Sequence, residues 1–218
     1  ELKAVARSFK TKDKVLISPI STASKFFRVY QGQGFLWRTT EADVAQVESM
    51  LLAAIESEAS KVALLTDFTE YGDTFFDFFG FFAAEFGMKP EDVSVTRYEQ
   101  DDAGPDGCAS SMGELLAAEP DILFAVPTNR TQLRCMVQVM DEHRKGGGTT
   151  RLMLSDSGYD VSVLQELGEA ASGVEGFALT APPDTGFDLA FKRHFNTDVV
   201  PAYAANIYDS LLLMAYGL

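Results

Sequence analysis

The stretch Lys61-Val-Ala-Leu-Leu-Thr-Asp67 decides the fold, because it is an apolar run that ends on polar residues and is followed directly by a helical pattern. The same succession recurs at Asp121-Ile-Leu-Phe-Ala-Val126 and at Arg151-Leu-Met-Leu-Ser155. Strands that alternate with helices indicate a parallel, doubly wound α/β sheet. Such sheets bind ligands at the carboxyl ends of their strands. We therefore expect function in the loops that follow these three runs, residues 67–71, 127–130 and 155–159.

The rest of the chain continues this pattern, with helices that carry apolar residues on one face and short apolar strands between them. Ser111 and Glu114 have the spacing of a capping box and predict the start of one helix. Helices are predicted at 24–30, 41–57, 72–86, 111–119, 129–145, 161–171, 187–195 and 201–216, and further strands at 15–18, 35–38, 93–98 and 175–180.

Composition limits the classes of partner. The chain has 218 residues, of which 46% are hydrophobic, enough for one large domain or two small ones. Its net charge of −14 repels phosphate backbones, so we expect no nucleic-acid partner. No apolar run approaches the roughly 20 residues that span a bilayer. We therefore expect no direct membrane insertion by this chain.

Several short motifs, taken in order, carry a family resemblance. The first are Val15-Leu-Ile-Ser-Pro-Ile-Ser-Thr-Ala23, Phe35-Leu-Trp-Arg-Thr-Thr-Glu-Ala-Asp43 and Lys61 to Asp67 followed by Tyr71-Gly72. Glu119-Pro-Asp121, Val174-Glu-Gly176 and Tyr208-Asp209 follow. Together they resemble the type I periplasmic solute-binding proteins, and among these the branched-chain amino acid binders most. The resemblance covers nearly the whole chain and implies two flavodoxin-like lobes, joined by hinge strands, with the ligand between them.

The resemblance also implies a domain division. Residues 1–40 correspond to part of lobe one, residues 41–181 to a complete lobe two, and residues 182–218 to the return into lobe one. Family members have further strands and helices before the first motif, where this sequence has about a dozen residues. They also continue into the rest of lobe one after Tyr208-Asp209, where this sequence ends. The expected fold is therefore one complete lobe plus part of the other, as in a fragment that lacks the start and end of lobe one.

Candidate ligand-binding residues follow from the same resemblance. A zwitterionic amino acid needs donors for its carboxylate and an acceptor for its ammonium, because unpaired buried charges are costly. The resemblance assigns Ser21 and Thr22 to the carboxylate, Tyr71 to an aromatic contact and Asp156 to the ammonium, and Thr128 could add a hydroxyl. Each has a structural alternative: a helix cap for Ser21, Thr22 and Thr128, a surface position for Tyr71, and an ordinary turn for Asp156.

The helix expected at 72–86 contains more phenylalanine than one buried face requires. A stripe at i, i+3, i+4 and i+7 spacing should form core; it comprises Phe75, Phe78, Phe79, Phe82 and Phe86. Phe76 and Phe81 then point elsewhere. They either lie against neighbouring elements or mark a contact patch for a transporter or a second subunit.

The two cysteines give a clue to the compartment. Cys108 and Cys135 lie on consecutive predicted helices, which a doubly wound sheet of strand order 2-1-3-4-5 places side by side on one face. A disulfide between them would fit an oxidising periplasm. Two buried free thiols are the alternative, and the sequence leaves both open.

Function is expected to be binding. His143 and His194 are isolated from each other, so a histidine-based triad or a metal cluster lacks its parts, and no phosphate-binding glycine motif follows a strand. We therefore expect no catalytic residues, no metal and no cofactor.

The leading hypothesis is an extracytoplasmic or periplasmic solute-binding component of an ABC importer. It would close its lobes on a small-molecule ligand, an amino acid or related carboxylate, and deliver it to the membrane subunits of the transporter. One alternative is the ligand-binding ectodomain of a sensor or receptor of the same fold. Another is a flavodoxin-like enzyme that uses the carboxylates Asp67 and Asp156.

Overall fold

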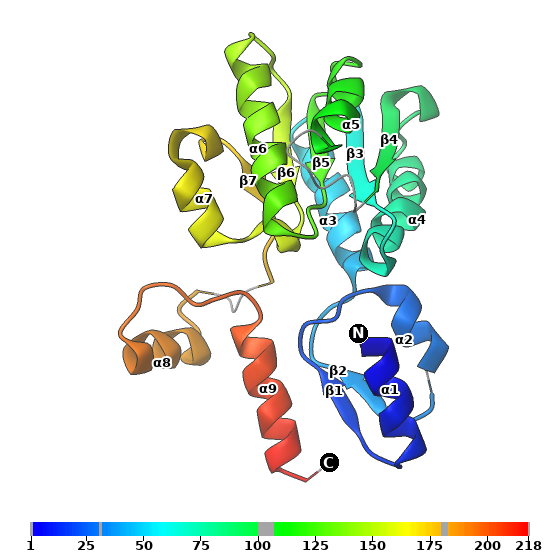
Figure 1. Cartoon of the computed structure of the whole chain (residues 1–218), viewed down its shortest axis with the longest axis vertical. Coiled ribbons are helices and arrows are strands. Elements are labelled where there is room, and N and C mark those ends of the chain that lie inside the picture. Colours follow the sequence, from blue (N-terminus) through cyan, green and yellow to red (C-terminus); the bar gives the residue numbers. More distant parts are fainter. Residues whose placement is uncertain (1, 31, 100–106, 180–182, 218) are drawn as a thin grey trace. The chain divides into compact units, whose positions relative to one another are not determined.

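The computed structural model describes residues 2–30, 32–99, 107–179 and 183–217 (Figure 1). The chain divides into two compact units, and each is described by itself. Unit 1 comprises Glu1–Ala42 with Leu179–Leu218, and unit 2 comprises Asp43–Ala178. The divisions thus fall after residues 42 and 178, compared with 40 and 181 expected from the sequence. None of the helices in the described ranges is long and apolar enough to cross a membrane.

Unit 2 is built around one sheet of five parallel strands. The strand order β4-β3-β5-β6-β7 is the predicted 2-1-3-4-5 order, so the flavodoxin-like fold class is confirmed. The elements are α3 (Asp43–Glu56), β3 (Val62–Asp67), α4 (Glu70–Glu85), β4 (Val93–Tyr98), α5 (Gly107–Leu116), β5 (Ile122–Ala125), α6 (Arg130–Lys145), β6 (Arg151–Leu154), α7 (Val161–Leu167) and β7 (Glu175–Gly176), with short 3-10 turns at Pro90–Asp92, Asp156–Gly158 and Gly168–Ala171.

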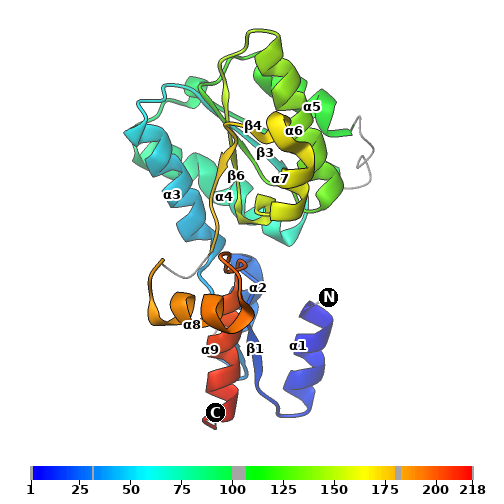
Figure 2. The ribbon, with the colours of Figure 1, turned by 90° about the vertical axis from the view of Figure 1, so that its left-hand side faces the viewer.

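Helices cover both faces of this sheet, with α3 and α4 on one side and α5, α6 and α7 on the other (Figure 2). Strand β3, which pairs with β4 on one side and β5 on the other, is buried along its whole length, which explains why it reads as a continuous apolar run. Successive residues face opposite layers, since Leu64 packs with α3 and α4 whereas Leu65 packs with α5 and α6. The carboxyl ends of all strands therefore meet at one edge of the sheet.

Helix α4 buries its phenylalanine stripe as predicted. It begins after Thr69, whose side chain accepts a hydrogen bond from the Gly72 amide. Phe75 and Phe79 are fully buried. The other members of the stripe are partly buried and pack against the same core; they are Phe78, Phe82 and Phe86. Phe76 and Phe81 are exposed, as expected from their place off the stripe.

Phe76 lies against a neighbouring element. The guanidinium of Arg97 on β4 is 4.7 Å from the centre of the Phe76 ring and 4.1 Å from that of Phe68. Arg97 also forms an ion pair with Asp73 at 2.6 Å. This group fastens the start of α4 to the end of β4.

Helix α5 begins at Gly107, not at Ser111, so the predicted capping box is wrong. Cys108 and Met112 are one turn apart on the core side of α5, and burying both extends the helix toward its start. Cys108 forms a disulfide with Cys135 of α6, and their Cα atoms are 6.2 Å apart. The bond joins α5 and α6, which lie side by side on one face of the sheet (Figure 1).

Unit 1 combines the start of the described chain with its return segment. Its elements are α1 (Leu2–Thr11), β1 (Leu16–Ser18), α2 (Ser24–Tyr30), β2 (Leu36–Arg38), α8 (Gly186–Phe195) and α9 (Ala204–Ala215), and β1 pairs with β2 in parallel. Helix α1 was not predicted. Trp37 is 52% exposed, and its ring nitrogen donates to the Gly34 carbonyl.

Hydrogen bonds fasten the two segments of unit 1 to each other. The Thr39 hydroxyl lies 2.8 Å from the Asn206 carbonyl and 2.7 Å from the Ser210 hydroxyl. In return, the Asn206 amide donates to the Thr39 carbonyl at 2.5 Å. Residues that are more than 160 positions apart are thus held together just before the chain enters unit 2.

Candidate functional site

Two of the predicted binding residues, Tyr71 and Asp156, touch each other. The Tyr71 hydroxyl donates to Asp156 Oδ1 at 2.5 Å. Tyr71 lies in the first turn of α4, and Asp156 begins the 3-10 turn after β6, so each side chain comes from a loop that follows a parallel strand. The convergence of such loops at one edge of the sheet brings together residues that are 85 positions apart.

Asp156 is a buried carboxylate, with only 4% of its surface exposed. Burial raises the pKa of this carboxyl above its usual value, whereas hydrogen bonds from Tyr71, Gln46 and the Ser157 backbone oppose the shift. Burial, followed by the charges of Asp156 and Asp43, raises the pKa of the Tyr71 hydroxyl well above its usual value. Tyr71 therefore remains a neutral hydrogen-bond donor at physiological pH.

Asp67 closes β3 and organises the loop that leads to Tyr71. Its Oδ1 accepts from the Thr69 amide at 3.0 Å and from the Thr69 hydroxyl at 2.6 Å. Gly72 packs directly on this loop, because a Cβ there would lie 2.3 Å from Asp67 Oδ1. Asp67 Oδ1 thus shapes the loop that leads to Tyr71.

Thr128 does not cap the helix that follows it. The cap of α6 is Asn129, whose side chain accepts from the Gln132 amide. The Thr128 hydroxyl lies instead 2.9 Å from Asp67 Oδ2 and 2.8 Å from Gln132 Oε1. Thr128 therefore links the loop after β5 to the loop after β3.

A pair of serines joins these contacts into one network. Ser157 Oγ lies 3.2 Å from the Tyr71 hydroxyl and 2.8 Å from Ser155 Oγ. It also donates to the Pro127 carbonyl at 2.5 Å, beside Thr128. The three loops predicted to carry function are consequently bonded to one another at one edge of unit 2.

Ser21 and Thr22 belong to unit 1 and are not part of this network. They lie in the loop between β1 and α2, where the Ser21 amide donates to Ser18 Oγ at 3.2 Å. Thr22 is buried, and its carbonyl accepts from Arg38 at 3.1 Å. The Arg38 guanidinium stacks 4.4 Å from the centre of the Phe27 ring, so this loop is held in place from β2 and α2.

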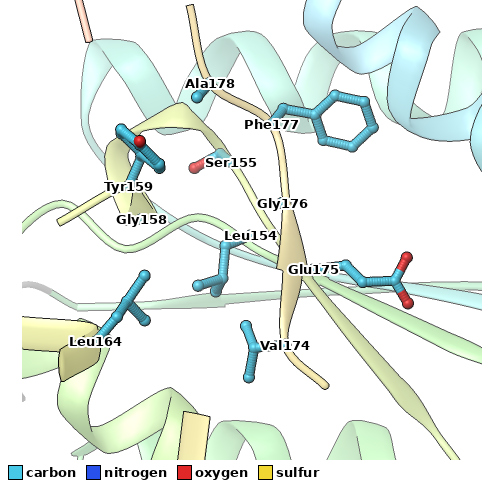
Figure 3. Close-up of a pocket in the computed structure, with 10 residues that line it drawn as sticks. All are labelled: Leu154, Ser155, Gly158, Tyr159, Leu164, Val174, Glu175, Gly176, Phe177 and Ala178. Atoms are coloured by element: carbon cyan, nitrogen blue, oxygen red, sulfur yellow. The ribbon is translucent and has the colours of Figure 1, made fainter. Parts of the chain in front are cut away.

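A cavity of about 280 Å³ lies beside the third loop (Figure 3). It is formed between the end of β6, the turn after it, α7 and the edge strand β7, all within unit 2. Its lining is mostly apolar, with Leu154, Leu164 and Val174 on one side and the backbone of Gly176 on the other.

The sequence did not single out several members of the site. Asp43 is 2% exposed at the start of α3, and its charge acts on Tyr71. Gln46, one turn further, donates to Asp156. Ser155 and Ser157 flank Asp156, and their place directly after a predicted strand was the one available signal.

The Asp156→Asn variant should gain stability relative to the wild-type chain as the pH rises. The folded-state pKa of Asp156 exceeds the unfolded value, so stability from its protonated form is fully present below about pH 3.9. It is lost as the pH rises through the folded-state pKa. Asparagine cannot ionise. The free energy of unfolding of the variant minus that of the wild-type chain should therefore become more positive between about pH 4 and pH 7, as measured by urea unfolding.

The exposed Asp198 provides the matched control, because Asp198→Asn removes a carboxyl from the surface of unit 1. Surface changes of this kind should stay within about 0.5 kcal/mol at each pH. An Asp156→Asn difference that does not vary with pH would contradict the role of burial at this carboxyl.

The fold is shared with solute-binding proteins of known structure. A solute-binding protein of an ABC transporter from R. palustris, in complex with 4-hydroxybenzoate, is 18% identical and superimposes with a TM-score of 0.78 over 97% of this chain and 57% of its own. A putative branched-chain amino acid ABC transporter protein from Rhodospirillum rubrum is 14% identical and superimposes with a TM-score of 0.67 over 96% of this chain and 58% of its own. A fatty acid ABC transporter substrate-binding protein from Thermomonospora curvata is 14% identical, with a TM-score of 0.69 over 95% of this chain and 53% of its own.

These likenesses confirm the fold that the sequence motifs indicated, that of the type I periplasmic solute-binding proteins. The chain spans a little over half the length of each of these neighbours. No protein-family profile and no curated protein matches the sequence. The neighbours are binding proteins, and their ligand classes differ chemically: an aromatic acid, branched-chain amino acids and fatty acids.

Proposed function

We propose that this chain belongs to an extracytoplasmic solute-binding protein that binds a small polar molecule and delivers it to an ABC importer. The observation that supports this most is the bonding of the three predicted loops into one network around Tyr71 and Asp156, on a fold shared with such proteins. In this proposal, Tyr71, Thr128 and Asp156 of unit 2 and Ser21 and Thr22 of unit 1 all contribute to ligand binding. The protein acts by binding and carries out no catalysis.

The ligand class proposed is an amino acid or a related small carboxylate. A carboxylate needs hydrogen-bond donors, which the hydroxyls and amides of the loop at Ser21 and Thr22 supply. An ammonium group needs an acceptor, and Asp156 supplies one where its oxygens remain available beside Tyr71. Because the Asp156 carboxylate already accepts from Tyr71 and Gln46, its hydrogen bonds rearrange when an ammonium group binds.

A thermal-shift screen of the chain against amino acids, hydroxybenzoates and short fatty acids tests this proposal. A ligand present at 100 times its dissociation constant should stabilise the protein by about 2.7 kcal/mol. Calorimetry on the hit should then show that Tyr71→Phe weakens binding by at least about fivefold, which corresponds to the loss of one hydrogen bond. The variant keeps the ring and its packing on Phe75, so the fold should persist.

Tyr216→Phe is the control, since Tyr216 is 86% exposed and its hydroxyl has no role in the site. This variant should bind the ligand as tightly as the wild-type chain. If no compound in the screen stabilises the protein, or if both variants bind equally, the proposed site is wrong and the likeness describes the fold alone.

A further inference from the structure

The cavity beside the third loop exists because the edge strand carries small residues on one face. Along β7 and its flanks, the side chains of Glu175 and Phe177 point to one side of the strand, whereas Val174 and Ala178 point to the other side, where Leu164 and Tyr159 lie (Figure 3). Gly176 lies between these two and has no side chain, so it leaves the space above Leu154 empty. A short helix opposite, α7, contributes Leu164 to the wall and then ends at Leu167.

The positions around Leu154 are packed too closely for the cavity to be filled by a small adjustment. A Cβ at Gly176 would lie 3.0 Å from the Leu154 carbonyl oxygen, and one at Gly158 would lie 2.7 Å from Leu154 Cβ. Both glycines therefore let the backbone approach Leu154. The rigid wall that results keeps the hollow open beside them.

The cavity presents no charge to a ligand. Glu175 is the one ionisable carboxyl in its lining, and its side chain points away from the hollow (Figure 3). Both of its oxygens accept from Arg151, at 2.9 and 2.7 Å. The polar side chains in its lining besides Glu175 are neutral hydroxyls, that of Tyr159, a residue that is 38% exposed, and that of Ser155, which lies 2.8 Å from Ser157 Oγ. A charged ligand would lose its hydration here without gaining a partner.

We propose that this cavity is a binding site for a small, uncharged phenol. Its volume of about 280 Å³ lies just below the range of pockets that take drug-sized ligands, and so fits a single ring. Leu154, Leu164 and Val174 enclose the ring, and the Tyr159 hydroxyl pairs with the hydroxyl of the ligand. The site lies wholly within unit 2 and does not depend on the function proposed above.

Titration of the isotope-labelled chain with phenol, followed by amide chemical shifts, tests this site. Phenol should shift the amides of Val174, Gly176 and Ala178 in a saturable manner. Benzoate and benzylamine, which have similar rings but carry a negative and a positive charge, should each bind at least about tenfold more weakly, because their charge must be desolvated. Equal binding of the three compounds would overturn the assignment of an uncharged ligand.

A pair of matched substitutions tests the location. Val174→Phe places a ring inside the cavity and should abolish the saturable shifts. Val95→Phe makes the same change on β4, the strand at the other edge of the sheet, and should leave phenol binding unchanged. Ala178→Leu, at an exposed position of the lining, blocks the mouth and serves if Val174→Phe does not fold. Shifts that persist in a folded blocking variant, or an absence of saturable shifts in the wild-type chain, would refute the site.

Discussion

Replacing Phe79 by alanine is expected to lower the free energy of unfolding of unit 2 by about 3–5 kcal/mol, the largest effect of any single substitution considered. Phe79 is fully buried between α4 and the sheet, and its ring centre is 5.6 Å from that of Phe124 on β5. Truncation removes the apolar surface and leaves a cavity between rigid elements, so both costs add. Hydrogen exchange of the slowest amides in β3 and β5 would measure the change for this unit.

The same helix provides the control. Phe81 lies two residues further and is 55% exposed, so Phe81→Ala should change the stability of unit 2 by no more than about 0.5 kcal/mol. Both variants replace a phenylalanine by alanine within α4 and alter helix propensity equally. Similar losses in the two variants would show that the predicted stripe does not separate core from surface.

Removal of the disulfide should have the second largest effect. Cys108 and Cys135 are 27 positions apart, and closing a loop of this length stabilises a protein by about 3–4 kcal/mol through the entropy of the unfolded chain. The Cys108→Ala/Cys135→Ala variant should lose this amount in urea unfolding under oxidising conditions. Both side chains are buried, so the variant also loses a small packing contribution.

Unfolding in the presence of a reductant separates the two contributions. When its disulfide is reduced, the wild-type chain should lose most of the free energy of unfolding by which it exceeds the double-alanine variant. The stability of the variant should be unaffected by the reductant. If the reductant changes the stability of both proteins equally, the bond contributes nothing, and the cysteines act only as small apolar residues of the core.

The architecture of unit 2 was predictable because each strand and helix is marked by a pattern in its own stretch of sequence. Buried parallel strands read as apolar runs, and the order 2-1-3-4-5 is that of one common doubly wound sheet. The phenylalanines of α4 follow the helical period, which is why the burial of Phe75 and Phe79 agreed with the pattern. The start of α5 was mistaken because a capping-box spacing also occurs by chance inside a helix, where Cys108 and Met112 one turn apart decide the boundary.

The sequence predicted where the site lies, but not which side chains contact each other there. The loops after three strands had to meet at one edge, and Tyr71, Thr128 and Asp156 are indeed there. Their partners could not be named, because a contact such as Tyr71 with Asp156 depends on side-chain directions across loops that are 85 positions apart. Asp43 illustrates the same limit, since its burial depends on how α3 packs and not on its neighbours in sequence.

The hydrogen bonds between Thr39 and the helix that carries Asn206 and Ser210 affect the order in which the chain acquires its structure during synthesis. Unit 2 is one continuous segment, so it can fold as soon as residues up to 178 have left the ribosome. Unit 1 must wait for its second segment, because the hydrogen-bond partners of Thr39 lie on α9. The first segment of unit 1 is thus made before unit 2 but is secured after it, through slowly formed contacts between residues that are more than 160 positions apart.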